Sequence, residues 1–185
     1  ILNVEKASMD KVLANAEIKT MINAFGCGFS EGYGNDFDIA KLRYHKIVLM
    51  TDADVDGLHI RMLLTTFFMR FYRQLIMDRR VFILETPLFR VRNPKAKDSG
   101  QYYCFTDEER EKAIKACGKN CEITRFKGLG ELNAKEFIGP GMRLTPVTCG
   151  DDSEADKTIK FYMGGNTPER REYIMENLVC DASDF

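Results

Sequence analysis

The sequence predicts an α/β fold: a parallel sheet with flanking helices, followed by a mostly helical C-terminal segment. Residues 46–51 form a short continuous apolar run, which is typical of a strand buried on both faces of a parallel sheet. Apolar residues then recur at helical spacing between residues 60 and 76, and a second apolar run follows at residues 81–84. This succession of strand, helix and strand is the right-handed crossover unit of a parallel α/β sheet.

A helix is also predicted before the first strand. Residues 8–25 carry apolar side chains at three-to-four spacing, and Ser8 can cap the start of this helix while Gly26 can end it. The crossover helix is expected to continue to Arg79 and Arg80, whose positive charges suit a helix C-terminus.

The pattern weakens after the second strand, where short elements alternate with polar turns. The elements expected are a strand at residues 101–105, a helix from residue 106 to 116, a strand at residues 122–126 and a last helix from residue 167 to about 178. Thr106 and Thr167 are expected as N-caps because their hydroxyls can accept a hydrogen bond from the first helical turn. Pro168 suits the first turn of the last helix.

Composition limits the class of protein. With 185 residues, of which 44% are hydrophobic, the chain can bury one sizeable core. No run approaches the roughly 20 apolar residues that a membrane span needs, and the N-terminus lacks a signal-peptide pattern, so we expect a cytoplasmic protein with no membrane segment. Six cysteines without a C-x-x-C pair and two histidines argue against a structural zinc site and favour reduced thiols.

The charge balance bears on nucleic-acid binding. A formal net charge of -1 and a pI near 6.2 argue against an isolated nucleic-acid binder, because such domains usually have a large basic excess. Any DNA affinity must therefore be local or shared with a partner. The sequence opens on Ile1 without an initiator methionine, so we expect a fragment of a longer chain.

An acidic cluster follows the first predicted strand. Asp52, Asp54 and Asp56 stand at alternate positions, and an extended backbone would place their carboxylates on one side, where mutual repulsion favours a bound cation. Such oxygen ligands suit Mg²⁺, and open α/β sheets bind ligands outside the carboxyl ends of their strands. Gly57 permits a sharp turn into the helix, where His59 could touch a phosphate at the helix N-terminus.

Other interpretations of this acidic string are weaker. Asp52 or Asp56 could cap the following helix, which leaves two carboxylates unexplained. An EF-hand calcium loop would need a preceding helix and a Glu at its twelfth position, where Leu63 stands. An aspartyl phosphotransferase of haloacid-dehalogenase type would use Asp52 as its nucleophile, but that family expects Thr or Val in place of Asp56. The phosphotransferase is kept as the alternative function.

Residues 41–61, Lys-Leu-Arg-Tyr-His-Lys-Ile-Val-Leu-Met-Thr-Asp-Ala-Asp-Val-Asp-Gly-Leu-His-Ile-Arg, resemble the Toprim signature of the B subunits of bacterial type II DNA topoisomerases, the family of gyrase B and topoisomerase IV B. Four further segments resemble motifs of that family in the same order: residues 1–7, 86–91, 125–131 (Arg-Phe-Lys-Gly-Leu-Gly-Glu) and 142–144. Together these segments cover most of the chain, and in combination they are highly specific.

The resemblance implies a Toprim-like, Rossmann-like core over residues 1–110, with its first strand missing. A C-terminal B-subunit segment with the Lys-Gly-Leu-Gly-Glu motif would follow over residues 111–185. It also implies a reaction, in which a tyrosine of the partner A subunit attacks double-stranded DNA, a second duplex passes through the gap and the break is resealed. The parent enzyme would be an A2B2 heterotetramer that uses ATP, which this segment would not bind.

The resemblance further implies roles for single residues. Asp52 and Asp54 would be the catalytic ligands of Mg²⁺, with Asp56 supporting the metal site from the loop. Side chains expected against the DNA backbone are Asn3, His59, Lys127 and Arg143. For Lys127, a solvated turn lysine is an equally good interpretation.

The sequence also departs from the family pattern. The family's catalytic acid lies in an upstream Glu-Gly-Asp-Ser-Ala motif, and no Glu of this chain, including Glu5, matches it. The ATPase and transducer domains of the family are likewise not in the sequence. We therefore expect this chain alone neither to hydrolyse ATP nor to cleave DNA, which leaves a third possibility, a non-catalytic module that docks on the A subunit. The motifs do not separate gyrase from topoisomerase IV.

Overall fold

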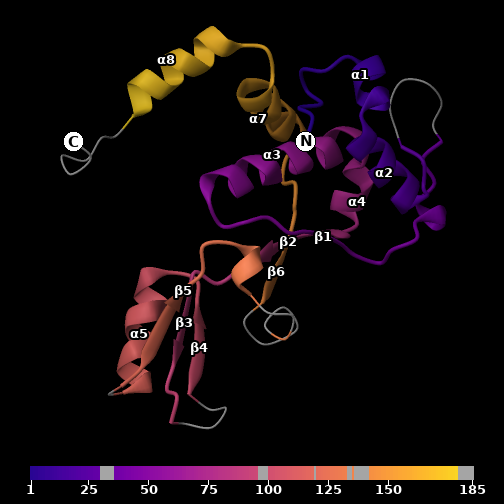
Figure 1. The fold of residues 1–185 in the computed structure, drawn as a ribbon. Helices are drawn as coiled ribbons and strands as arrows, with labels where there is room; N and C mark the ends of the chain where they lie inside the picture. Colours follow the sequence, from indigo (N-terminus) through magenta and orange to yellow (C-terminus); the bar gives the residue numbers. More distant parts are fainter. Residues whose placement is uncertain (30–35, 96–99, 119, 133–134, 136–141, 179–185) are drawn as a thin grey trace. The chain divides into compact units, whose positions relative to one another are not determined.

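The computed structural model describes residues 1–29, 36–95, 100–118, 120–132, 135 and 142–178 (Figure 1). The chain forms two compact units: unit 1 holds residues 1–43, 65–77 and 148–185, and unit 2 holds residues 44–64 and 78–147. Both units are discontinuous in sequence. Residue 110, near which the sequence predicts a domain boundary, lies inside a helix of unit 2, and that boundary stays a prediction.

The predicted succession of strand, helix and strand with parallel pairing is confirmed, and the two strands lie in unit 2. Strand β1 (Ile47–Leu49) pairs in parallel with β2 (Val81–Glu85), in a register that sets Val48 opposite Phe82. Helix α3 (Val55–Phe71) and the short α4 (Arg73–Met77) connect the two strands. Strand β6 (Arg143–Pro146) pairs with β2 in the antiparallel direction, which gives the sheet order β1-β2-β6.

The position of β1 in its sheet differs from the prediction. Residues 46–51 were expected to form a strand buried on both faces, but in the described sheet β1 lies at the edge and pairs with β2 alone. Leu49 is buried, whereas Val48 is 37% exposed. An apolar run indicates that a strand can be buried. Whether the strand lies at the centre or at the edge of its sheet depends on distant parts of the chain, which supply the neighbouring strands.

Unit 2 also contains an antiparallel sheet covered by one helix. Strand β3 (Phe89–Arg92) lies between β4 (Gln101–Cys104) and β5 (Glu122–Arg125). Helix α5 (Asp107–Cys117) packs on this sheet through a small cluster of Phe89, Val91, Cys104, Ala113 and Cys117. Thr106 is the N-cap of α5 as predicted, since its hydroxyl accepts a hydrogen bond from the Glu109 amide at 3.2 Å.

Unit 1 is built from helices around an aromatic core. Its elements are α1 (Met9–Ala14), α2 (Ala16–Phe25), the C-terminal half of α3, α4, α7 (Asp152–Met163) and α8 (Thr167–Asn177), with a short 3-10 turn at Ile39–Lys41. The core rings are Phe25, Phe67, Phe68, Phe71 and Tyr72, and they meet at centroid distances between 5.3 and 5.9 Å. The apolar stripe of the crossover helix is therefore core from Leu63 onward, as predicted, whereas its first residue, Ile60, is exposed. Burial of each phenylalanine ring stabilises the fold by roughly 1.5–3 kcal/mol.

Two predicted helices are interrupted. The helix expected over residues 8–25 divides at Asn15, whose extended backbone (ψ 128°) ends α1 and whose side chain accepts a hydrogen bond from the Ile18 amide at 3.0 Å. Asparagine favours such caps because its side chain competes for backbone amides. The crossover helix likewise divides at Tyr72, between α3 and α4, and it starts at Val55, five residues before the expected stripe.

The start of the last helix is confirmed in part. Pro168 lies in the first turn of α8, but the N-cap is Asn166, one residue before the predicted Thr167. The Asn166 side chain donates a hydrogen bond to the Glu169 carboxylate at 3.1 Å, so it engages the first turn through a side chain instead of a backbone amide.

No described helix has the length and apolar character needed to cross a membrane. Five of the six cysteines lie in the described residues, and these five are free thiols.

Candidate functional site

The loop between β1 and α3 fixes the second aspartate of the acidic string. The Gly57 amide donates a hydrogen bond to Asp54 Oδ1 at 2.7 Å, and the Leu58 amide donates to the Asp54 carbonyl at 3.0 Å, so Asp54 is the N-cap of α3. The sequence had suggested Asp52 or Asp56 as a possible cap, but not Asp54. A Cβ at position 57 would lie 2.0 Å from the Asp52 carbonyl oxygen, so the close approach of that carbonyl requires glycine.

The side chain of Asp52 is fixed from a distant part of unit 2. The Leu129 amide donates a hydrogen bond to Asp52 Oδ1 at 2.7 Å, across a separation of 77 residues. Leu129 opens a 3-10 turn (Leu129–Glu131) within the motif of residues 127–131. Next to it, a Cβ on Gly128 would meet Asp52 Oδ1 at 3.0 Å. The acidic loop and the Lys-Gly-Leu-Gly-Glu turn are therefore in direct contact.

Asp56 takes a different position from its two neighbours. It lies in the first turn of α3, where the backbone is already helical. The alternation that would set all three carboxylates on one side requires an extended backbone, but β1 ends at Leu49, the chain bends at residues 53 and 54, and Asp56 is helical. Among the described residues, no three His, Cys, Asp or Glu side chains are grouped so that they could hold a metal ion. Asp52 and Asp54 both lie in the loop between β1 and α3.

The strand end beneath these aspartates is held by a buried polar contact. Thr51 is 5% exposed, and its hydroxyl oxygen accepts a hydrogen bond from Nη2 of Arg61 at 3.3 Å. Arg61 lies on α3, two residues after the exposed His59. This contact joins the end of β1 to the helix that follows the acidic loop.

Arg143, at the start of β6, carries a composite set of contacts. Its guanidinium lies over the Phe105 ring at 4.0 Å from the centroid, and Nη2 donates to Glu109 Oε1 at 3.0 Å. The second Glu109 oxygen accepts the Phe105 amide at 2.7 Å. The amide bond from Phe105, followed by the bond from Arg143, lowers the pKa of the Glu109 carboxyl below its ordinary value. The Arg143 side chain remains 52% exposed, which leaves part of its donor set facing solvent.

The other residues expected near DNA have simpler surroundings. Lys127 is exposed, and its backbone amide donates to Glu131 Oε2 at 2.8 Å. Asn3 belongs to unit 1, where its side chain donates to the Met163 carbonyl at 2.9 Å and accepts the Glu5 amide at 3.0 Å. His59, Lys127 and Arg143 belong to unit 2 together with the aspartates.

Several contributing groups were not singled out from the sequence. The Leu129 amide, Gly128 and the pair of Phe105 and Glu109 act through backbone atoms or through contacts with residues far away in the chain. The glycine-rich character of the turn was the one available signal, and it did not indicate Asp52 as the partner.

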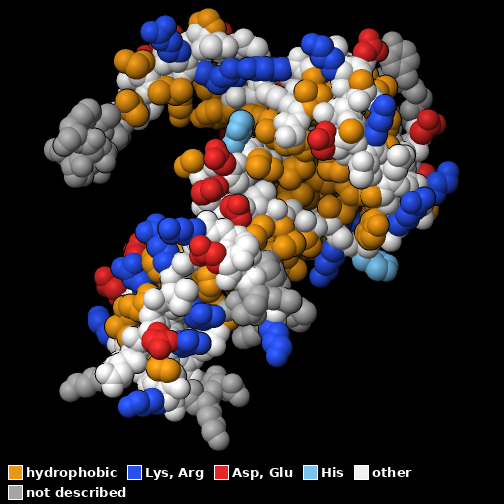
Figure 2. All heavy atoms as spheres, viewed as in Figure 1, with side chains coloured by type: hydrophobic (Ala, Val, Ile, Leu, Met, Phe, Trp, Pro, Cys, Tyr) orange, Lys and Arg blue, Asp and Glu red, His pale blue; other side chains and the backbone are white. Residues whose placement is uncertain are grey.

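Basic side chains are interspersed with acidic and apolar ones on the face shown in Figure 2, which agrees with a net charge of -1. No single basic face dominates this view. Arg143, with its half-exposed side chain, is one local group that could contact a polyanion.

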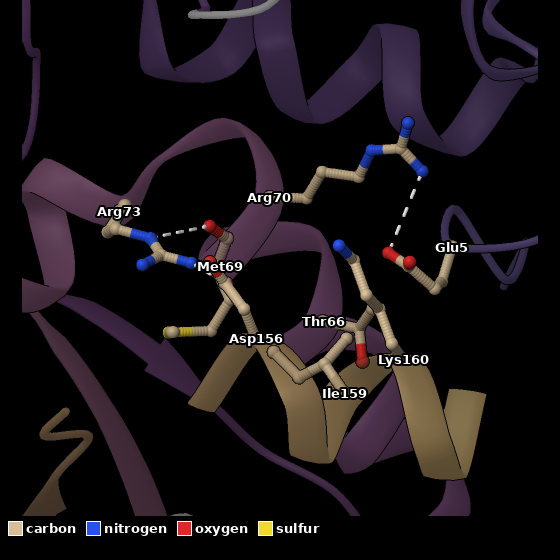
Figure 3. A pocket seen from close by; sticks show the side chains of 8 residues that line it. All are labelled: Glu5, Thr66, Met69, Arg70, Arg73, Asp156, Ile159 and Lys160. Carbon is tan, nitrogen blue, oxygen red and sulfur yellow. Dashed lines mark hydrogen bonds and ion pairs between the residues drawn. The ribbon is translucent and has the colours of Figure 1, made fainter. Parts of the chain in front are cut away.

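Unit 1 contains a polar cavity of about 430 Å³. Figure 3 shows its lining residues: Glu5, Thr66, Met69, Arg70, Arg73, Asp156, Ile159 and Lys160. Arg70 forms an ion pair with Glu5 at 3.8 Å, and Arg73 pairs with Asp152 at 3.2 Å and with Asp156. Two of the basic side chains that line the cavity are therefore paired with acidic residues of unit 1. None of the residues predicted for metal or DNA binding lines this cavity.

Comparison with known families and proteins identifies the chain. Residues 1–86 match the Toprim domain family, and residues 118–175 match the family described as DNA gyrase B subunit, carboxyl terminus. The B subunit of DNA topoisomerase 4 from Borreliella burgdorferi is 45% identical over 181 residues, which cover 96% of this chain and 28% of that protein.

Two gyrase proteins give the same result. The DNA gyrase B subunit of Staphylococcus aureus is 46% identical over 192 residues, covering 100% of this chain and 29% of the relative. The DNA gyrase B subunit of Clostridium acetobutylicum is 44% identical over 185 residues, covering 96% of this chain and 28% of the relative. The chain spans less than a third of the length of these relatives. It belongs to the B subunits of bacterial type II DNA topoisomerases, of which it contains the Toprim region and the carboxyl-terminal region.

Proposed function

We propose that this chain is the Mg²⁺-dependent cleavage and religation core of an ATP-dependent type II DNA topoisomerase, within its B subunit. It would act in the cytoplasm on double-stranded DNA, together with the tyrosine of an A subunit in an A2B2 assembly. ATP would be bound elsewhere in the parent protein. The observation that carries the proposal is the placement of two carboxylates, Asp52 and Asp54, after a parallel strand, with Asp52 contacted by the turn at residues 127–131 and Asp54 by the Gly57 amide.

The donor set fits Mg²⁺. This cation is usually bound by one or two carboxylates, with waters and substrate phosphates completing its octahedron. Asp52 and Asp54 each use Oδ1 for a backbone amide, so Oδ2 of each remains for a cation. Gly128 leaves the space beside the Asp52 carboxylate that a Cβ would fill. Mg²⁺ held there would offset negative charge at the reacting phosphate oxygens.

The protein's own residues would hold and orient the substrate. Asp56, in the first turn of α3, would add negative charge near the site without being a direct ligand. His59, Lys127, Arg143 and Asn3 would contact the DNA backbone, which positions a duplex without reading its sequence. The catalytic Glu of the family's motif has no counterpart in these 185 residues, and no residue of this chain is assigned its role.

Titration with Mg²⁺, followed by calorimetry, tests the metal site. Wild-type chain is expected to bind the ion more tightly than Asp52→Asn and Asp54→Asn, because each substitution removes a charged ligand while keeping the size of the side chain. Asp10→Asn, which changes an exposed acid in the first turn of α1, is the matched control and should bind as the wild type does. Equal weak binding by all four proteins would remove the metal site from the proposal.

A further inference from the structure

We infer that the turn at residues 127–131 positions Asp52 as a metal ligand. The Leu129 amide engages Oδ1, and the lack of a side chain at Gly128 lets the carboxylate stay in place with Oδ2 directed to a cation. The inference rests on the proposed function, since it assigns a role to the turn in the same site. In this role the Lys-Gly-Leu-Gly-Glu motif acts on the metal through Asp52, with no direct contact of its own required.

Steric room explains why glycine occupies position 128. Gly128 has an extended backbone (φ -166°, ψ 175°), which any residue can adopt, so the backbone conformation does not call for glycine. An added Cβ would instead meet Asp52 Oδ1 at 3.0 Å, Cγ at 3.2 Å and Oδ2 at 3.4 Å. The methyl group of alanine would therefore push directly against the carboxylate. Gly130 provides the contrast, because a Cβ there has no neighbour within 4 Å.

The turn itself is well anchored, so it can serve as a fixed support. At its start, Phe126 is buried and its amide donates to the Leu88 carbonyl at 2.9 Å. At its end, the buried Leu132 donates from its amide to the Leu129 carbonyl at 3.2 Å. Glu131 closes the loop by accepting the Lys127 amide at 2.8 Å. Groups that orient a ligand in this way typically change metal affinity by about tenfold or more when they are lost.

Comparison of Gly128→Ala with Gly130→Ala tests this role. Both variants add one methyl group to the same turn, but only the first methyl meets Asp52. Binding of Mn²⁺, used as a paramagnetic substitute for Mg²⁺ and followed by electron paramagnetic resonance, is expected to weaken about tenfold in Gly128→Ala and to stay unchanged in Gly130→Ala. Amide hydrogen exchange at Leu129 is expected to accelerate in Gly128→Ala alone, because the bond to Asp52 is displaced.

The outcomes separate this inference from the proposed function. Tight Mn²⁺ binding by wild type, weak binding by Asp52→Asn and unchanged binding by Gly128→Ala would overturn the positioning role and leave the metal site standing. Weak binding by wild type and Asp52→Asn alike would overturn both. Thermal unfolding checks that each variant folds. If Gly128→Ala does not fold, Glu131→Ala tests the positioning role in its place, because it removes the bond to the Lys127 amide without adding atoms beside Asp52. This variant should also weaken Mn²⁺ binding, and unchanged binding would overturn the positioning role.

Discussion

At the scale of single residues, Asp54 has two separate duties. Its Oδ1 caps α3 by accepting the Gly57 amide, and its carboxylate charge belongs to the proposed metal site. The two duties can be separated chemically. Asparagine caps a helix about as well as aspartate does, but its amide oxygen is neutral and is a much poorer ligand for Mg²⁺.

We therefore expect Asp54→Ala and Asp54→Asn to differ in stability and to agree in metal binding. Loss of the cap in Asp54→Ala should lower the free energy of unfolding by about 1 kcal/mol, whereas Asp54→Asn should keep most of it. Urea denaturation without divalent metal measures the first effect. Calorimetric titration with Mg²⁺ measures the second, and tight binding by either variant would show that Asp54 is not a ligand.

At the scale of secondary-structure elements, Glu109 links α5 to the start of β6. It accepts the Phe105 amide with one oxygen and the Arg143 guanidinium with the other. Arg143 is thereby held over the Phe105 ring in a defined orientation. A prediction about pH follows, because the same hydrogen bonds lower the pKa of the Glu109 carboxyl in the folded protein.

A carboxyl whose pKa is lower in the folded than in the unfolded protein stabilises the fold at pH values above its unfolded-state pKa, which is about 4.3 for Glu. This stabilisation is lost as the pH falls through the pKa of the folded state. Wild type should thus exceed Glu109→Gln in stability by up to about 1 kcal/mol at pH 7, since the pair is partly exposed. The difference should shrink once pH falls below about 4. Urea denaturation at pH 7 and at a pH below about 4 measures this difference in stability.

Glu111→Gln is the control for this experiment, because Glu111 is an exposed glutamate of the same helix. Its stability relative to wild type should change little between the two pH values. A Glu109→Gln difference that persists unchanged at low pH would contradict the role of the ionised carboxylate.

At the scale of the whole molecule, the net charge of -1 leads us to expect that DNA binding is shared with a partner. Basic side chains are interspersed with acidic ones on the visible face, so we expect the chain alone to bind a duplex weakly and a mixture with an A subunit to bind it strongly (Figure 2). Both affinities should fall as salt rises, because phosphate contacts release counterions.

The contribution of Arg143 can be read from the salt dependence of the mixture. Arg143→Gln should reduce the slope of log K against log salt by about 0.9, the value expected for one phosphate contact. Arg92→Gln is a matched control, since Arg92 is also ion-paired, to Glu122, and its side chain is 47% exposed compared with 52% for Arg143. Fluorescence anisotropy with a labelled duplex measures both slopes. Equal slopes for the two variants, or strong binding by the chain alone, would contradict this assignment.

Local patterns in the sequence correctly predicted much of the fold. Apolar runs marked β1 and β2, helical spacing marked the core face of α3, and Thr106 marked the start of α5. These signals are reliable because periodicity and capping depend on residues only a few positions apart. The break at Asn15 and the shifted cap at Asn166 were missed, since a residue that can cap a helix does so only where the surrounding chain turns.

By itself the sequence determined the α/β class, the parallel crossover and the position of Asp52 and Asp54 after a strand, together with the family to which those motifs belong. Only the tertiary structure decided that β1 lies at an edge of the described sheet, that Asp54 caps α3 and that the Leu129 amide reaches Asp52. The reason is physical: backbone periodicity is a short-range property, whereas the partner of a carboxylate 77 residues away depends on how the strands and turns of unit 2 pack.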